Sequence, residues 1–133
     1  MANLTDPEIR GLLEPANYAV ISTLNDDGSI SSSVVWVSLE GDELAVNSAR
    51  GRKWPTNLDR DPHVTLMVYA PDNPYEYVEI RGTATGSRDD ADDHINRLAK
   101  KYINQDEYPY RQPGEQRLKY TITPDVVRYL KQR

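Results

Sequence analysis

Hydrophobic residues near the start of the chain recur at helical spacing. Thr5 and Glu8 fit a capping box, and the apolar positions that follow predict a short amphipathic helix. Beyond it, segments rich in β-forming residues are separated by turn residues, which is the pattern of a β-meander. The expected strands of this meander are residues 18–24, 30–39 and 43–47.

The second half of the chain holds the one strongly amphipathic segment. Residues 89–104 place their apolar side chains on a single stripe, with four Asp residues at the start, where the helix dipole favours anions. Trp54 and Leu58 lie four residues apart and indicate a shorter helix over 52–60. Residues 105–116 lack periodicity and are expected to form a loop. The remaining expected strands are residues 63–70, 75–87, 117–123 and 126–130.

These elements predict a mainly β (α+β) fold. Six or seven strands joined mostly by hairpins do not alternate with helices as a parallel α/β sheet requires. An antiparallel barrel with short flanking helices is the simplest closure, because it removes exposed sheet edges. With 133 residues, 38% of them hydrophobic, we expect a single domain over residues 1–133.

Composition narrows the function classes. The chain has no Cys, hence no disulfide, thiol nucleophile or Cys-ligated metal, and its net charge of −5 argues against a general electrostatic grip on nucleic acid. It begins without a basic, then apolar, leader and has no apolar run of about 18 residues. We therefore expect a cytoplasmic protein without a nucleic-acid or membrane partner.

The side chains do not predict a self-sufficient catalyst. His63 and His94 are the only histidines, and neither has metal-ligand spacing to another candidate, so both are expected to be structural and no metal is expected. Carboxylate pairs such as Asp26 and Asp27 fall in predicted turns or caps. If the protein is an enzyme, a bound cofactor supplies the reactive atoms, and no catalytic side chain is assigned.

A basic turn between a strand and a helix is the main candidate for binding. Arg50, Arg52 and Lys53 surround a glycine there, so backbone N–H groups and cationic side chains can converge on one anion, such as a phosphate. Ser48 adds a hydroxyl, and Asn57 returns to the same side one helical turn after Lys53. The same spacing also fits a solvated basic turn, and the pattern alone leaves both readings open.

Two further segments are candidates for contact with a ring or with a partner. The strand over residues 31–37 begins with small hydroxyl residues, Ser33 among them, which leave room for a planar ring. Trp36 at its end is suited either to wall that ring or to the core. Tyr75 and Tyr77 share one strand face, which fits an interface, a site rim or an ordinary exposed strand.

Taken in order, these pieces resemble the split β-barrel flavin-binding superfamily that includes pyridoxamine 5′-phosphate oxidase. The likeness is closer to its deazaflavin-dependent branch, whose members use coenzyme F420, and it covers roughly residues 9–130. The pieces that carry it are the Asp27-Gly28 hairpin, the Val34-Val35-Trp36 strand, and residues 47–53, 57–64, 77–84 and 113–115.

This resemblance implies a six- to seven-stranded split β-barrel that transfers a hydride from reduced F420 to an unsaturated small-molecule substrate. It assigns the cofactor phosphate to Arg52 and Lys53, assisted by Ser48 and Asn57. The ring is assigned to the strand of Val34, Val35 and Trp36.

It also implies a homodimer with the cofactor in a groove between two barrels, where Tyr75, Tyr77 and the loop around Tyr110 and Arg111 could reach the partner's site. Tyr75 is a candidate proton donor. An FMN enzyme on the same barrel, or a flavin carrier without turnover, stays open as an alternative. The longer anionic tail of the deazaflavin needs additional cations, for which the candidates are Arg50, Arg60 and Arg81.

Overall fold

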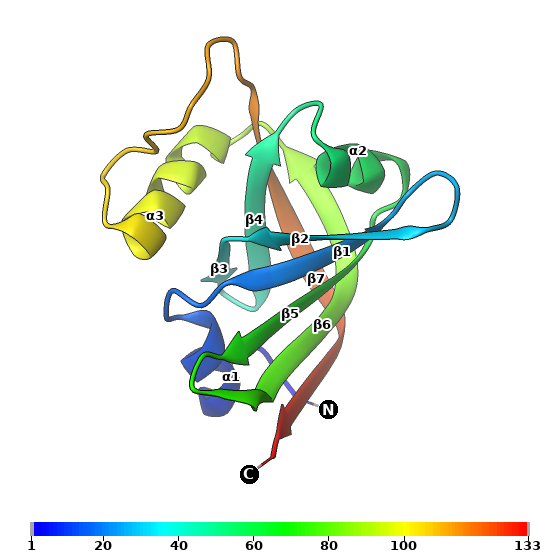
Figure 1. Cartoon of the computed structure of the whole chain (residues 1–133), viewed down its shortest axis with the longest axis vertical. Helices are drawn as coiled ribbons and strands as arrows, with labels where there is room; N and C mark the ends of the chain where they lie inside the picture. The colour runs from blue at the N-terminus through cyan, green and yellow to red at the C-terminus, as the bar shows by residue number, and fades with distance from the viewer. Residues whose placement is uncertain (1, 133) are drawn as a thin grey trace.

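The structure is a computed structural model and describes residues 2–132. Within that range the chain forms seven strands and three helices, and strands dominate (Figure 1). The elements in chain order are α1 (Pro7–Leu13), β1 (Ala19–Leu24), β2 (Ile30–Val35), β3 (Val37–Glu40), β4 (Glu43–Ala49), α2 (Lys53–Arg60), β5 (His63–Ala70), β6 (Asn73–Ser87), α3 (Ala91–Ile103) and β7 (Arg117–Lys131).

One antiparallel sheet holds all the described strands, in the order β2-β1-β5-β6-β7-β4-β3. Its two edge strands, β2 and β3, are neighbours in sequence and are separated only by Trp36. The sheet therefore curls until its two edges are joined by one residue of chain, which gives a split, half-closed barrel (Figure 1). The predicted mainly β split barrel is confirmed, but the strand expected over 30–39 is broken at Trp36.

The last two expected strands are one continuous strand, so the predicted break at Pro124 is wrong. β7 pairs with β6 along almost its whole length, and the register shifts between Arg81 and Gly82, where Gly82 faces Pro124. Pro124 has no N–H to donate to the ladder, and the irregularity absorbs that missing bond without ending the strand.

The core lies on the concave face of the sheet. Along β5 the burial alternates, with Val64, Leu66 and Val68 inside, as expected for a sheet with one covered face. The short helix α1 adds Ile9 and Leu13 to this core at one end of the barrel (Figure 1). No helix between residues 2 and 132 is long and apolar enough to cross a lipid bilayer.

The start of α1 differs from the predicted capping box. Asp6 rather than Thr5 precedes the helix, and the Thr5 hydroxyl donates instead to Asn3 Oδ1 over 2.9 Å. The Asp6 carboxylate accepts the Asn3 N–H, so a local turn uses both side chains that could have capped the helix.

We predict that Gly82→Ala destabilises the protein by about 2 kcal/mol, because the added carbon would lie 2.4 Å from the Thr123 carbonyl oxygen, which is backbone and cannot move aside. Urea denaturation measures the change. The control is Gly11→Ala in α1, where the added carbon meets nothing within 4 Å and a small gain in stability is expected. Equal stability of Gly82→Ala and the natural chain would show that the β6–β7 contact is looser than described.

Candidate functional site

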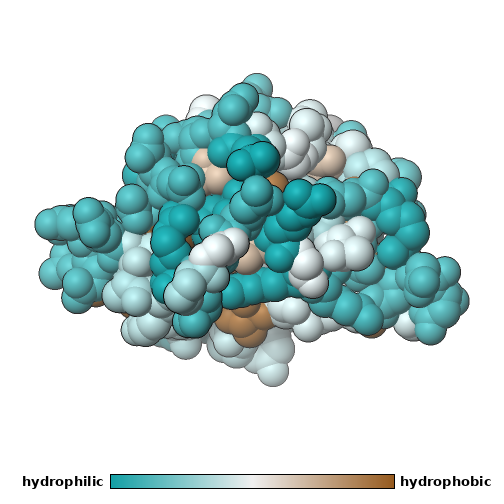
Figure 2. Space-filling model, turned by 90° about the horizontal axis from the view of Figure 1, so that it is seen from above, coloured by the Kyte–Doolittle hydropathy of each residue, from teal (hydrophilic) through white to brown (hydrophobic). Residues whose placement is uncertain are grey.

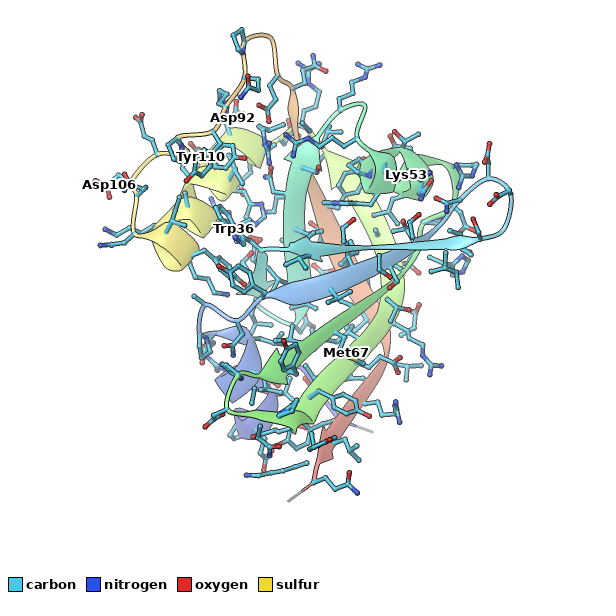
Figure 3. The ribbon with its side chains drawn as sticks, in the orientation of Figure 1. Trp36, Lys53, Met67, Asp92, Asp106 and Tyr110 are labelled. Atoms are coloured by element: carbon cyan, nitrogen blue, oxygen red, sulfur yellow. The ribbon has the colours of Figure 1, made fainter. Side chains whose placement is uncertain are left out.

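A cavity of about 230 Å³ lies where the β2–β3 link, β4, α3 and the α3–β7 loop (residues 104–116) meet. In Figure 3, Trp36 lies beside α3 and Tyr110 lies above it in the loop. The residues that line the cavity are Tyr18, Val34, Val35, Trp36, Asn47, Ser48, Arg52, Trp54, Ile95, Leu98, Tyr108, Tyr110 and Arg117.

One wall of the cavity is aromatic and is held from behind by α3. The Trp36 ring stacks on Tyr102 with centroids 5.3 Å apart and an angle of 5° between the ring planes. The Tyr102 hydroxyl donates to the Asn17 carbonyl over 2.6 Å and accepts the Val37 N–H over 3.2 Å, which fixes its ring. Trp36 therefore presents a fixed face at the point where the two sheet edges join.

Lys101 ties α3 to the elements around Trp36 through two hydrogen bonds. Its ammonium donates to the carbonyls of Leu13, at 2.8 Å, and Val37, at 2.6 Å, so α3 is tied both to the end of α1 and to the start of β3. Burial lowers the pKa of Lys101 to about 8.

A buried ion pair adjoins the cavity through Arg117, which lines it. The side chains of Arg117 and Glu115 are 2% and 5% exposed and are bonded directly to each other. Arg117 also donates from Nε to Asn47 Oδ1 over 2.9 Å, and its guanidinium lies 4.9 Å from the centre of the Tyr108 ring. Arg52, whose side chain is half exposed, lies 3.7 Å from the same Glu115 oxygen.

Glu115 also organises the loop above the cavity. Its second oxygen accepts the Gln112 N–H over 2.7 Å. Burial alone would raise the pKa of Glu115, but the hydrogen bonds from Gln112 and Arg117 outweigh it and leave the pKa below its ordinary value. The carboxyl group is therefore ionised at neutral pH, and it holds two arginines and the loop together.

Asn47 connects this ion pair to a buried histidine. Its amide donates to the Ala91 carbonyl over 2.9 Å and lies 3.1 Å from His94 Nδ1, while His94 Nε2 lies 2.9 Å from the Ser38 hydroxyl. With the amide nitrogen donating, Nδ1 accepts and Nε2 carries the proton. His94 is fully buried, and that burial lowers its pKa to about 4. His94 is thus a neutral spacer that fixes the Asn47 amide.

Five of the predicted site residues line the cavity together: Val34, Val35, Trp36, Ser48 and Arg52. They come from β2, its link to β3, β4 and the turn before α2. The β2–β3 strand and the basic turn, which are separate in the sequence, are therefore parts of one hollow.

The other residues predicted at the basic turn and on β2 lie outside the cavity. Asn57 is buried, and its amide donates to Thr23 Oγ1 over 3.0 Å and to Asn25 Oδ1 over 2.9 Å, which holds α2 against the β1–β2 hairpin. Lys53 begins α2, apart from Trp36 in Figure 3, and its charge contributes to lowering the pKa of Asp27.

Arg50 and Ser33 also point elsewhere. Arg50 donates to Gln116 Oε1 over 3.3 Å and lines a neighbouring hollow that includes Asp59. Ser33 is exposed on β2, opposite Ile21. Arg60 and Arg81, two of the candidates for binding an anionic cofactor tail, also do not line the cavity. Arg60 donates to the Leu24 carbonyl, and Arg81 lies 3.3 Å from Glu79.

The tyrosines expected to reach a partner's site divide into two groups. Tyr110 lines the cavity of its own chain, and the neighbouring Arg111 pairs with Asp92 over 2.6 Å. Tyr75 and Tyr77 belong to the start of β6 and do not line the cavity.

Sequence reasoning missed Arg117 and Tyr108. Each carries a weak local signal, since Arg117 follows Glu115 at strand spacing and Tyr108 precedes a second tyrosine by two residues. Only the fold brings them to the basic turn, which lies more than fifty residues earlier in the chain. No three His, Asp or Glu side chains between residues 2 and 132 come together as metal ligands would.

The cavity is suited to a flat ring that carries an anionic group. Indole, phenol and aliphatic side chains give it apolar walls, and Arg52 and the buried Ser48 provide donors at one end. Next to Arg52, the first turn of α2 has backbone N–H groups that no carbonyl of the same helix can accept.

The comparisons with known proteins agree with this geometry. The family model described as pyridoxamine 5′-phosphate oxidase matches residues 5–131. The chain is similar to an F420 reductase, at 25% identity and a TM-score of 0.78, over 90% of this chain and 94% of that one. No curated protein matches the sequence.

Two other solved structures share the fold. The putative pyridoxamine 5′-phosphate oxidase from Listeria innocua is 21% identical, with a TM-score of 0.72 over 92% of this chain and 95% of its own. General stress protein 26 from Bacillus anthracis str. Sterne is 20% identical, with a TM-score of 0.69 over 92% of this chain and 91% of its own.

We predict that His94 makes stability rise with pH between about 4 and 6.5. In that range the unfolded state binds a proton on this residue and the folded state does not, so folding loses about 3 kcal/mol by pH 4. Urea denaturation at several pH values, compared with His94→Gln, measures this contribution. The exposed His63→Gln is the matched control, and identical pH slopes for His94→Gln and the natural chain would contradict a neutral buried His94.

Proposed function

We propose that this chain, which belongs to the pyridoxamine 5′-phosphate oxidase family, is an oxidoreductase that uses the deazaflavin coenzyme F420 to reduce an unsaturated small molecule. The family is shown by the match over residues 5–131, and the fold is that of its flavin-binding oxidoreductases. The observation that carries the proposal is that Arg52, Ser48 and the aromatic side chain of Trp36 line one and the same cavity.

Arg52 and Ser48 hold the cofactor phosphate in this proposal. Arg52 supplies a charge-assisted hydrogen bond and Ser48 a hydroxyl. The first N–H groups of α2 add fixed dipoles to the same anion, and Lys53 at the start of that helix, which does not line the cavity, adds a positive charge at longer range. A phosphate therefore replaces solvent beside Arg52.

Trp36 and the strand before it position the ring. Its stacking on Tyr102 fixes the indole, and Val34 and Val35 extend the same wall. Tyr108 and Tyr110 border the cavity from the α3–β7 loop and reduce the access of water to the ring.

Bound in its reduced form, the deazaflavin supplies a hydride. The task of this chain is to hold the phosphate, present one ring face and align an acceptor within about 3.5 Å of it. A conjugated acceptor such as a quinone, an enone or a tetrapyrrole-like molecule fits this chemistry. The completing proton comes from water or from a tyrosine, with Tyr75 of a second copy as the candidate.

FMN is the second candidate cofactor. It also joins a flat tricyclic ring to a phosphate, so the aromatic wall and Arg52 would serve both cofactors in the same way. The similarity to an F420 reductase supports the deazaflavin as the first choice. A carrier function is the remaining alternative, in which the ring binds but no acceptor is reduced.

We predict that Arg52→Ala weakens F420 binding about tenfold or more, because it loses a charged contact with the phosphate, and that Lys53→Ala weakens it less, because it loses only a longer-range attraction. Titration of purified protein with F420 and FMN separately, followed by fluorescence, measures the affinities. A panel of acceptors mixed with protein and reduced F420 then separates an enzyme from a carrier.

The matched control is Arg10→Ala, which removes an exposed arginine of α1 that pairs only with Glu14 among the described residues. FMN that remains bound during purification, together with no response to F420, would replace the deazaflavin by FMN. Unchanged F420 affinity of Arg52→Ala would remove the phosphate from this end of the cavity.

We also propose that two copies pair through the convex face of the sheet. Tyr69, Tyr77 and Leu130 occupy one register row across β5, β6 and β7, and Tyr75 next to this row is 63% exposed. Apolar residues gathered on a solvated face are typical of an interface. Pairing there gives Tyr75 and Tyr77 a place at the second copy's cavity, which they do not have at their own.

We predict that Leu130→Glu shifts the protein from dimer to monomer, because it places a charge at the β7 end of this apolar row, directly beside Tyr77. Light scattering coupled to size-exclusion chromatography measures the mass. Lys100→Glu on the exposed face of α3 is the control and stays dimeric. A natural chain that is monomeric at micromolar concentration would contradict the pairing.

A further inference from the structure

We propose that Glu115 makes the cavity select a phosphate diester, which carries one negative charge, over a phosphate monoester, which carries two. This inference rests on the proposed function, because it takes the phosphate of a ring cofactor to bind beside Arg52. It assigns a specificity-determining role to a residue that sequence reasoning gave no separate role.

The charges that line or touch this end of the cavity add up to one positive charge. Arg52 and Arg117 are cations, and Glu115 is an anion that contacts both of them. The other cations of the basic turn do not line the cavity, since Lys53 begins α2 and Arg50 lines a neighbouring hollow together with Asp59.

Burial makes the charge of Glu115 effective at the ligand. Its side chain and that of Arg117 are almost completely covered, so little solvent screens them. An anion hydrogen-bonded to Arg52 shares that guanidinium with the Glu115 carboxylate, which is only 3.7 Å away from it. Each negative charge on the ligand is therefore attracted by Arg52 and repelled by Glu115 at short range.

The two candidate cofactors differ in this one property of their phosphate. FMN carries a monoester, whose second ionisation near pH 6 gives it close to two negative charges at neutral pH. F420 carries its phosphate as a diester, which keeps a single charge there. A site with one net positive charge is matched by the diester and leaves the second charge of the monoester uncompensated.

The surface seen from above is mostly hydrophilic, with hydrophobic residues in small patches between polar ones (Figure 2). The part of an anionic ligand that extends beyond the cavity at this end is therefore able to remain in water.

The test uses matched ligands that differ by one ionisable oxygen, which is free in the phosphate and carries a methyl group in the ester. Riboflavin and its 8-hydroxy-5-deaza analogue are each prepared as the 5′-phosphate and as its methyl ester, and all four are titrated into the protein at pH 8. The natural chain is expected to bind the methyl ester about tenfold more tightly than the phosphate for whichever ring it accepts. In Glu115→Gln the cavity gains one positive charge, and the preference is expected to vanish or reverse.

The control variant is Glu107→Gln, an exposed glutamate of the same loop with the same change in charge, which is expected to keep the preference. Thermal denaturation of each variant shows whether it folds. If Glu115→Gln does not fold, the comparison of phosphate and methyl ester on the natural chain still tests the inference. At pH 5 the monoester is mostly singly charged, so the two affinities should approach each other.

The groups around this end allow that pH comparison. Glu115 stays ionised because its pKa lies below its ordinary value, and His94 of α3, behind Asn47, stays mostly neutral because its pKa is about 4. The other charged groups that line the cavity or share a hollow with Glu115 are Arg52, Arg117, the Asp92–Arg111 pair, Arg88 and Asp89, and the phenols of Tyr18, Tyr108 and Tyr110 also line the cavity.

The outcomes separate the inference from the proposed function. Binding of either ring with equal affinity for phosphate and methyl ester at pH 8 overturns the role of Glu115 and leaves the cofactor site standing. A preference that persists unchanged in a folded Glu115→Gln also overturns it. No binding of either ring in any form overturns the proposed function, and with it the inference.

Discussion

The joining of the two sheet edges by a single residue is the constraint on which the rest of the molecule depends. Because β2 and β3 are one stretch of chain interrupted at Trp36, the sheet cannot flatten without pulling that residue out of place. The closure leaves a tryptophan at the end of a strand rather than within one. It also brings β2 beside the end of β4, where the basic turn begins.

Beside the aromatic wall at this junction, hydrogen-bonded polar side chains fix how the surrounding elements meet. Asn47 of β4 receives Arg117 of β7 on its oxygen and reaches His94 of α3 through its nitrogen, so three elements meet at one amide. Burial of the Arg117 guanidinium costs free energy unless the group is paired. Glu115 supplies the paired carboxylate from a loop without helix or strand. The loop is therefore positioned by charge.

The fold class could be predicted from the sequence because alternation, turn residues and a long amphipathic helix are local signals. The helix over 89–104 lies within two residues of α3, and the curled antiparallel sheet follows from hairpins that need closure. The site could be predicted only in its contiguous pieces, such as Arg52 and Trp36. Arg117 and Tyr108 lie far from both in sequence, and no periodicity reveals that β7 returns to pair with β4. Asn57 is the opposite case. Its spacing from Lys53 suggests a role in binding, but inside the fold its amide is hydrogen-bonded to Thr23 and Asn25.

The two hydrogen bonds of Lys101 have a mechanical consequence. By fastening α3 to the carbonyls of Leu13 and Val37, this ammonium group joins the N-terminal helix, the sheet junction and the back of the aromatic wall into one stiff body. The side of the cavity formed by α3 and the β2–β3 link is therefore rigid. Of the cavity's borders, the α3–β7 loop is one that Lys101 does not fasten, so we expect a ligand to enter and leave past this loop.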